Sequence, residues 1–410
     1  MPHPEPSSVT LRTHRWPFGV VLVAAIFITT LCLANAQTKP QSSGPLAQVL
    51  QPLVDNHIVA GAVALVANKN KVIDVETVGY ADLATHSPMH SNDEFWIASM
   101  TKPMTAAAVM MLVDEGKVKL DDPVEKYLPE FKGQMVRAVK PEKLNDPGEY
   151  HGALVPQSHP FTVREMLCHT AGLLFRSSVI EQHGVFDQHP LVEAVRAYAS
   201  EPLIYQPSTD YSYSNEDFNI AGRIIEVVSG MPYEKFMQQR LFNPLGMTDT
   251  TFWPSREQIS RLAKSYKTKA DGTGMVEVPI VQLTLPLDDH LHRYPLPAGG
   301  LFSTAHDATC FMQMLFNNGT FQGNKILSEA EVHEMTKVQN NGLEHAPYGF
   351  GLHIWRNKFG HNGAYKTSML AFPDSGAILV VMVQIGSGFN DKVLSPLDAV
   401  AEKLATDAAR

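Results

Sequence analysis

Hydrophobic residues gather in short, strand-like runs near both ends of the chain. Ala60 to Ala67 is an unbroken apolar run, and after a polar turn Val72 to Val78 follows, so the two predict a β-hairpin. Near the C-terminus, further strands are predicted over residues 350–355, 368–372 and 377–384, the last as a central strand. We therefore expect one antiparallel sheet assembled from both ends of the chain.

The middle of the chain shows the three- and four-residue spacing of apolar side chains that is typical of helices. Helices are predicted over residues 46–53, 162–172, 218–229, 233–241, 307–316, 328–335 and 397–405. Residues 132–160 and 254–296 lack this periodicity and predict loops. The fold class is therefore α/β (α+β): an antiparallel sheet flanked by helices, with sheet regions at about 45–120 and 340–405 and an inserted, mostly helical region at about 121–339.

The stretch from Phe95 to Met104 joins these two regions and carries the first candidate chemistry. Apolar spacing after Ala98 predicts a helix whose first turn holds Pro103, where no intrahelical N–H is needed. Ser99 then stands at the helix start with Lys102 one turn on, so the hydroxyl and the amine can meet. Burial lowers the pKa of a lysine enough to let it activate a serine. Taken alone, however, a serine before a helix is first of all an N-cap, so the assignment of Ser99 as a nucleophile depends on motifs further along the chain.

The amino-acid composition is that of an ordinary globular protein, and the charge argues against one class of partner. The 410 residues are 44% apolar and 18% charged, with a net charge of −9 and no long basic run, which argues against a nucleic-acid partner. The chain has no Gly-x-Ser-x-Gly elbow and no complete His-Glu-x-x-His motif. An α/β-hydrolase and a zinc peptidase are therefore not supported. The oligomeric state cannot be deduced from the sequence.

Residues 1–36 are predicted to be a signal peptide. Arg12 and Arg15 precede an uncharged run from Trp16 to Ala36, which ends in the small-x-small cleavage site Ala34-Asn35-Ala36. The mature domain would then span residues 37–400 and be periplasmic or extracellular. Because the run is nearly long enough to cross a bilayer, an anchor through residues 16–36 stays open.

Two cysteines, Cys168 and Cys310, remain after such cleavage, and both lie in apolar helical contexts where buried thiols are expected. Whether they pair stays open. His169, beside Cys168, is expected to make structural hydrogen bonds.

Tyr213-Ser214-Asn215 is the only Tyr-x-Asn in the chain. A phenolate at Tyr213 can share the proton of Ser99 and pass it to a leaving group. The carboxamide of Asn215 can contact both the substrate and Lys102. A tyrosine packed on a loop, followed by a turn asparagine, is the simpler interpretation of these residues alone.

His361-Asn362-Gly363 is the only His-x-Gly in the chain and lies between two predicted strands. Small residues here let a substrate lie against the strand, and the N–H of Ala364 can complete an oxyanion hole with that of Ser99. Asn-Gly is also the commonest hairpin dipeptide, so a turn is predicted at the same place.

In this order and at this spacing, the three motifs resemble those of the serine β-lactamase and penicillin-binding-protein family. The most similar branch contains class C β-lactamases, D-Ala-D-Ala carboxypeptidases and family VIII carboxylesterases. The resemblance covers roughly residues 45 to 400, and further stretches that carry it are residues 112–123, 166–173 and 297–305.

This resemblance implies a two-step acyl transfer without a metal or an organic cofactor. Ser99 attacks the carbonyl, and Lys102 and Tyr213 handle the proton. The amides of Ser99 and Ala364 hold the oxyanion, and Asn215 orients the substrate. Water then hydrolyses the acyl-enzyme, with Tyr213 as its base.

The motif at His361 departs from the family pattern, in which a lysine usually begins a Lys-Thr-Gly motif and holds the substrate carboxylate. A histidine is mostly neutral at pH 7, which favours uncharged small-molecule esters or amides. We therefore expect an exported, carboxylesterase-like serine hydrolase. A D-Ala-D-Ala carboxypeptidase or β-lactamase acting on cell-wall peptides or antibiotics stays open, as does a non-catalytic binding protein on the same fold.

Overall fold

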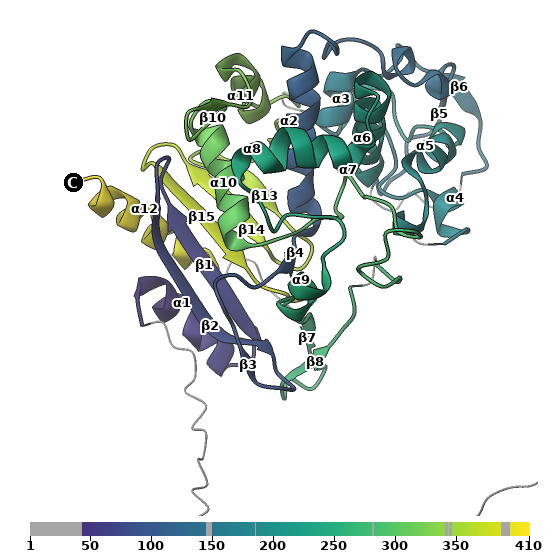
Figure 1. Ribbon diagram of the computed structural model, residues 1–410. Coiled ribbons are helices and arrows are strands. Elements are labelled where there is room, and N and C mark those ends of the chain that lie inside the picture. The colour runs from purple at the N-terminus through teal and green to yellow at the C-terminus, as the bar shows by residue number, and fades with distance from the viewer. Residues whose placement is uncertain are drawn as a thin grey trace, which may run out of the picture. The chain divides into compact units, whose positions relative to one another are not determined.

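The unit from Lys39 to Arg410 is built around a seven-stranded antiparallel sheet (Figure 1). This computed structural model describes residues 43–144, 150–184, 186–280, 283–340, 343, 347–386 and 394–410. The strand order is β12-β13-β14-β15-β1-β2-β3, so strands from the C-terminal end lie beside those from the N-terminal end. The sheet expected from the two ends of the chain is thus confirmed.

The first hairpin and the predicted central strand lie at the middle of this sheet. β1 (Gly61–Ala67) pairs with β2 (Val72–Asp82) on one side and with β15 (Ala377–Met382) on the other. On the β15 side, the sheet continues with β14 (Ser368–Phe372), β13 (Phe359–Asn362) and β12 (His353–Ile354), in this order. On the β2 side, it ends with β3 (Ser87–Pro88).

Helices cover both faces of the sheet, which explains the unbroken apolar run of β15. Its odd-numbered residues, such as Leu379, pack with α1 (Pro45–Asp55) and α12 (Pro396–Ala408). Its even-numbered residues, such as Val380, join the larger core on the other face, where α10 (Ala305–Phe316) lies. Alternate side chains of a strand point to opposite faces, so a strand covered on both sides is apolar throughout.

α2 (Thr101–Asp114) packs against α6 (Asn215–Ser229) and α11 (Glu329–Thr336), whereas α10 is the helix of the inserted region that contacts β1, β14 and β15. The other helices are α3 (Val163–Leu167), α4 (Ser178–Glu181), α5 (Leu191–Ser200), α7 (Tyr233–Phe236), α8 (Asn243–Leu245) and α9 (Arg256–Ser260), with a π-helical turn over Met237–Phe242. In Figure 1, α3 to α7 lie in the right-hand part, and α2 and α8 lie near the centre.

Two-stranded ribbons lie outside the main sheet. Residues 132–160 hold β5 (Met135–Arg137) paired with β6 (Leu154–Pro156), and residues 254–296 hold β7 (Tyr266–Thr268) paired with β8 (Met275–Glu277). Two more pairs are β4 (Phe95–Trp96) with β9 (Phe302–Ser303) and β10 (Thr320–Phe321) with β11 (Asn324–Lys325). The predicted loops thus contain short strands that the sequence pattern does not predict.

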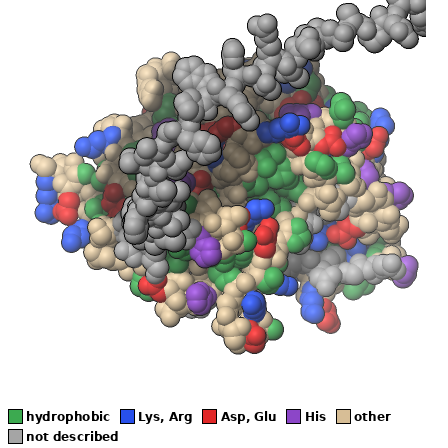
Figure 2. Space-filling model, turned by 60° about the horizontal axis from the view of Figure 1, so that its bottom comes forward, with side chains coloured by type: hydrophobic (Ala, Val, Ile, Leu, Met, Phe, Trp, Pro, Cys, Tyr) green, Lys and Arg blue, Asp and Glu red, His purple; other side chains and the backbone are tan. Residues whose placement is uncertain are grey.

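Several sequence predictions can be compared directly with the described residues. Cys168 and Cys310 are free, buried thiols. The predicted signal peptide and the alternative anchor lie outside the described residues, and no described helix has the length and apolar character needed to cross a bilayer. On the face that Figure 2 shows, acidic and basic side chains are interspersed rather than separated by sign.

Candidate active site

Ser99 lies in a short 3₁₀ turn, Ala98–Met100, that leads directly into α2, so it stands at the helix start as predicted. Its side chain is half-buried. The preceding residue, Ala98, has φ of 46°, a left-handed conformation that costs energy for a residue with a Cβ. Thr101 stabilises this turn, because its Oγ1 donates a hydrogen bond to the Ala98 carbonyl at 2.7 Å.

Lys102 extends from the first turn of α2 into a fully buried position beside Ser99. Its Nζ lies 3.3 Å from Ser99 Oγ, 2.8 Å from Asn215 Oδ1 and 2.8 Å from the Ala298 carbonyl oxygen. Burial lowers the pKa of Lys102 well below its ordinary value, although the nearby Asp217 carboxyl opposes this shift. The amine therefore favours its neutral form, the form that accepts a proton.

Tyr213 and Asn215 lie at the N-terminus of α6, which begins three residues earlier than the sequence pattern predicts. Ser214 is the N-cap, and its Oγ accepts a hydrogen bond from the Asp217 N–H at 3.3 Å. The Tyr213 ring centroid lies 4.7 Å from Lys102 Nζ. Burial raises the pKa of Tyr213, and a hydrogen bond with Ser99 opposes that shift, so the phenol keeps its proton at neutral pH.

The segment that precedes α10 lines the pocket beside α6. The Ile97 N–H donates to the Leu301 carbonyl at 3.0 Å, and Trp96 Nε1 donates to the Gly299 carbonyl at 2.8 Å. Asn219 fixes Ala298, because its Oδ1 accepts from the Ala298 N–H at 3.2 Å. Asn219 is not among the site residues predicted from the sequence, although it lies four residues after Asn215 on the same helix, a spacing that places the two on one face.

Gly363 and Ala364 belong to the turn between β13 and β14. A Cβ at Gly363 would lie 2.5 Å from the Ile97 carbonyl oxygen and still closer to Thr367 Oγ1, so no larger residue fits without movement. Thr367 Oγ1 also donates to the Ile97 carbonyl at 3.3 Å. The turn is therefore held against the segment that leads to Ser99, and Ala364 lines the same pocket as Ser99.

His361 points into the protein rather than into that pocket. It is 2% exposed, its Nε2 lies 3.1 Å from the Tyr348 hydroxyl, and its Nδ1 lies 2.8 Å from the Asn362 carbonyl. Burial, with the charges of His353 and Lys102, lowers its pKa well below the ordinary value. His361 is therefore neutral and is not among the residues that line the pocket at Ser99.

His169 and Asp217 form a buried pair behind Tyr213. His169 Nδ1 lies 2.6 Å from Asp217 Oδ2, and the His169 ring centroid lies 4.6 Å from that of Tyr213. Burial raises the pKa of Asp217 and lowers that of His169, so both groups favour their neutral forms. These contacts fit the structural hydrogen-bonding role expected of His169.

The pocket at Ser99 is small and uncharged. Its volume is about 70 Å³, and it is lined by Ala98, Ser99, Phe175, Asn215, Asn219, Leu296, Ala298, Gly299 and Ala364. None of these side chains carries a charge. Among the described residues, no group of three or more His, Cys, Asp or Glu side chains is arranged to hold a metal ion.

A family model described as Beta-lactamase matches residues 46–403 of the chain. The chain belongs to this family. It shares 30% identity with Protein Rv1367c of Mycobacterium tuberculosis, over 82% of this chain and 88% of that one. The family consists of serine hydrolases, so the expectations of family and enzyme class are confirmed.

Two further relatives and one solved structure differ in the activities that their names state. Esterase EstB of Burkholderia gladioli is 32% identical over 49% of each chain. A putative D-alanyl-D-alanine carboxypeptidase of Salmonella typhimurium is 27% identical over 74% of this chain and 70% of that one. The structure of EstCE1, a hydrolase with promiscuous acyltransferase activity, aligns with this chain at a TM-score of 0.71 and 22% sequence identity. The alignment covers 88% of this chain and 97% of that one, and it shows that the two share a fold.

Proposed function

We propose that this Beta-lactamase family member is an exported carboxylesterase that hydrolyses small, uncharged esters through an acyl-enzyme on Ser99. The observation that carries the proposal is the pocket at Ser99, where a buried, low-pKa lysine meets the serine and no lining side chain is charged. The named esterase relative agrees with this choice.

The contacts of Lys102 fit a neutral amine that takes the proton from Ser99. A neutral amine has two N–H bonds and one lone pair. The two N–H bonds match the 2.8 Å contacts to Asn215 Oδ1 and the Ala298 carbonyl, which leaves the lone pair for the Ser99 hydroxyl. In the proposed first step Ser99 Oγ bonds to the ester carbonyl carbon while its proton moves to Lys102.

Tyr213 is assigned to the leaving group. Its raised pKa keeps the phenol protonated, so it donates a proton to the departing alkoxide rather than acting as the first base. The proton on Lys102 then replaces the one that Tyr213 has given up. In the second step water bonds to the acyl carbon and its proton passes to Lys102, with the hydroxyl of Tyr213 as a relay. The same proton then returns to Ser99 Oγ as the bond between that oxygen and the acyl carbon breaks, and the acid is released. The N–H groups of Ser99 and Ala364 are proposed to hold the oxyanion in both steps.

An uncharged substrate is favoured over a carboxylate-bearing peptide or β-lactam. Recognition of a carboxylate requires a cation beside the scissile bond, as an arginine or lysine supplies. The residue at the family's lysine position, His361, is neutral and buried. Lys102 favours the neutral amine and is fully occupied by three contacts.

A D-Ala-D-Ala carboxypeptidase is the second candidate, because a relative so named aligns over most of the chain. The discriminating experiment compares turnover of a p-nitrophenyl short-chain ester with that of a chromogenic cephalosporin and a D-Ala-D-Ala peptide, using the mature domain. The proposal expects ester turnover that Ser99→Ala abolishes, with little turnover of the other two. Peptide or cephalosporin turnover of comparable kcat/KM would overturn the ester assignment.

A further inference from the structure

One face of α6 lies along the segment that precedes α10. Asn215, Asn219 and Gly222 follow one another at four and three residues, so they share one face of the helix. A Cβ at Gly222 would overlap the ring of Pro297, so α6 and this segment are in close contact. The helix face that supplies Asn215 to Lys102 therefore also packs against the segment before α10.

Two side chains hold the peptide unit between Pro297 and Ala298. The Pro297 carbonyl accepts a hydrogen bond from Thr105 Oγ1 of α2 at 2.8 Å. The Ala298 N–H donates to Asn219 Oδ1 of α6 at 3.2 Å. The next carbonyl along the chain, that of Ala298, accepts from Lys102 Nζ at 2.8 Å. The position of this carbonyl therefore depends on how the preceding peptide unit is held.

The side-chain amide of Asn219 has a single orientation in this arrangement. Because a backbone N–H only donates, the atom that faces Ala298 is the amide oxygen, and Nδ2 is left for another partner. Nδ2 donates to the Tyr198 hydroxyl at 3.0 Å, and Tyr198 belongs to α5, which packs against α6. Asn219 and Tyr198 are both buried, so the two contacts are shielded from bulk water.

Loss of the Asn219 oxygen would leave the Ala298 N–H buried without an acceptor. A buried N–H without a partner is costly, so the segment would move until the N–H meets another acceptor. Lys102 would then lose the carbonyl that holds one of its two N–H bonds, and its lone pair would no longer be held toward Ser99. A displacement of about 1 Å at a reacting group costs on the order of 100-fold in rate.

We propose that Asn219 is a positioning residue for the attack of Ser99. It fixes the Ala298 carbonyl where that carbonyl holds Lys102, and Tyr198 fixes Asn219 in turn. Asn219 lines the pocket at Ser99, but it acts through the amine and not by binding the substrate. The inference rests on the proposed function, because it concerns the proton transfer from Ser99 to Lys102.

Pre-steady-state kinetics with p-nitrophenyl acetate tests the proposal, because the burst of p-nitrophenolate gives the acylation rate constant and the dissociation constant of the ester separately. Asn219→Leu keeps the size of the side chain but removes the acceptor. We expect its acylation rate constant to fall about 10- to 100-fold, while the dissociation constant stays within about twofold. Tyr198→Phe should lower the rate constant by a smaller factor, of about three. Added to Asn219→Leu, it should have no further effect, because Tyr198 acts through Asn219.

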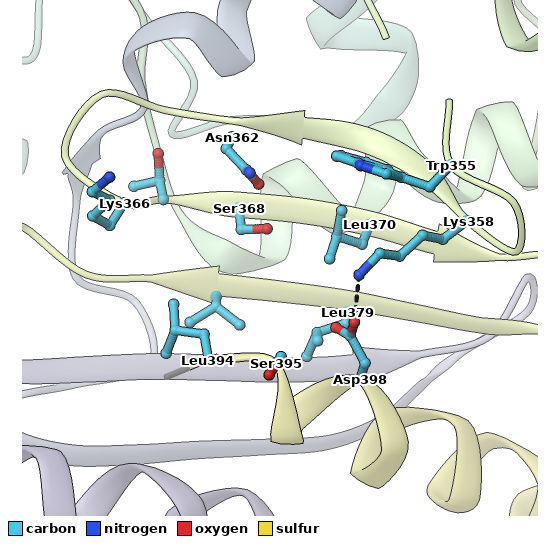
Figure 3. A pocket seen from close by; sticks show the side chains of 12 residues that line it. Trp355, Lys358, Asn362, Lys366, Ser368, Leu370, Leu379, Leu394, Ser395 and Asp398 are labelled. Atoms are coloured by element: carbon cyan, nitrogen blue, oxygen red, sulfur yellow. Dashed lines mark hydrogen bonds and ion pairs between the residues drawn. The ribbon is translucent and has the colours of Figure 1, made fainter. Parts of the chain in front are cut away.

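Two variants control for the loss of a polar group as such. Gln313→Leu removes a buried carboxamide on α10, whose Nε2 donates to the Asn68 carbonyl at 2.8 Å. Ser368→Ala removes a hydroxyl from a cavity on the α12 side of the sheet, between β14 and the start of that helix (Figure 3). Both variants should keep the acylation rate constant and the dissociation constant of the wild type, whatever their effect on stability.

Methanesulfonyl fluoride separates a failure of this inference from a failure of the ester assignment. In its reaction Ser99 Oγ bonds to sulfur, fluoride leaves and the Ser99 proton moves to Lys102, so the same proton transfer is measured without an ester. A wild type that is sulfonylated at Ser99 but hydrolyses no ester would overturn the ester assignment alone, and the sulfonylation rates of the same variants would then decide on Asn219. A wild type that reacts with neither compound would overturn both.

Three results would overturn the role of Asn219. The first is an unchanged acylation rate constant in Asn219→Leu. The second is a weaker dissociation constant with an unchanged rate constant, because Asn219 would then bind the ester directly. The third is an equal loss of rate in Gln313→Leu. Additive losses in the double variant would overturn the link from Tyr198 to Asn219. If Asn219→Leu does not fold, Tyr198→Phe decides, and an unchanged acylation rate constant in that variant would overturn the proposal.

Discussion

Lys102 Nζ lies 2.8 Å from Oδ1 of Asn215, a residue 113 positions further along the chain. This contact joins the first turn of α2 to the first turn of α6. Together with the contact to the Ala298 carbonyl, it holds the two N–H bonds of the neutral amine, so that the lone pair of the nitrogen faces the Ser99 hydroxyl. The proton transfer assigned to Lys102 therefore depends on a neutral side chain at position 215.

Asn215→Asp should shift the pH dependence of turnover to higher pH. A carboxylate beside Lys102 stabilises the ammonium form, so the pKa of Lys102 rises and the free base appears only at higher pH. We expect the acidic limb of kcat/KM to move up by more than about one pH unit. Asn324→Asp, at an exposed position on β11, should leave the profile unchanged. An Asn215→Asp enzyme with an unshifted limb would contradict the assignment of Lys102 as the base.

Tyr213→Phe should impair turnover according to the leaving group. An alkoxide needs a proton in the transition state, whereas p-nitrophenolate leaves without one. We expect kcat/KM to fall about 100-fold or more for an ethyl ester and much less for the p-nitrophenyl ester of the same acid. Equal losses for the two esters would mean that Tyr213 does not protonate the leaving group.

Gly363→Ala should impair activity because a methyl group at this position meets the Ile97 carbonyl oxygen at 2.5 Å. The turn that carries Ala364 must then move away from the segment before Ser99, which disturbs the proposed oxyanion hole. We expect a loss of about 10- to 1000-fold in kcat, comparable to the removal of one oxyanion donor. Gly386→Ala is the matched control, since its nearest contact would be an ordinary 3.4 Å, and it should keep wild-type kcat.

Glu94→Gln should stabilise the protein in mildly alkaline solution. Glu94 is fully buried, and burial, with the nearby Asp249, raises its pKa to about 9. The unfolded state loses this proton near pH 4.3. The native state therefore binds more protons between about pH 4 and pH 9, and stability falls as the pH rises through that window.

Denaturant unfolding at two pH values measures this effect. We expect Glu94→Gln to gain on the order of 2 kcal/mol at pH 8 and little at pH 4. Glu142→Gln, at an exposed position, should change neither value. A gain of the same size at both pH values would show that packing, rather than ionisation of Glu94, is responsible.

The sequence predicts those parts of the site that depend on short spacings. Ser99 and Lys102 are one helical turn apart, so their contact follows from the helix alone. The start of α6 could also have been predicted, because Ser214 and Asp217 have the spacing of an N-cap and its N3 residue. The predicted helix after Thr162 ends at Leu167 rather than at Gly172, since His169 adopts a left-handed conformation with φ of 64°.

Contacts between distant segments could not be predicted in this way. The Ala298 carbonyl reaches Lys102 across 196 positions, and nothing in the local pattern at Ala298 indicates it. The burial of His361 depends on the hydroxyl of Tyr348, which arrives from the segment before β12. The ribbon of β5 and β6 also cannot be predicted from the pattern of apolar side chains, because all three residues of β6 are exposed and no alternation of buried and exposed positions indicates a strand there.

Intact-protein mass spectrometry after rapid mixing with a p-nitrophenyl ester tests the central claim most directly. The account predicts a transient adduct of the mass of the acyl group, mapped by peptide digestion to Ser99 and absent in Ser99→Ala. Ester turnover without any adduct, or an adduct on another residue that persists in Ser99→Ala, would contradict it.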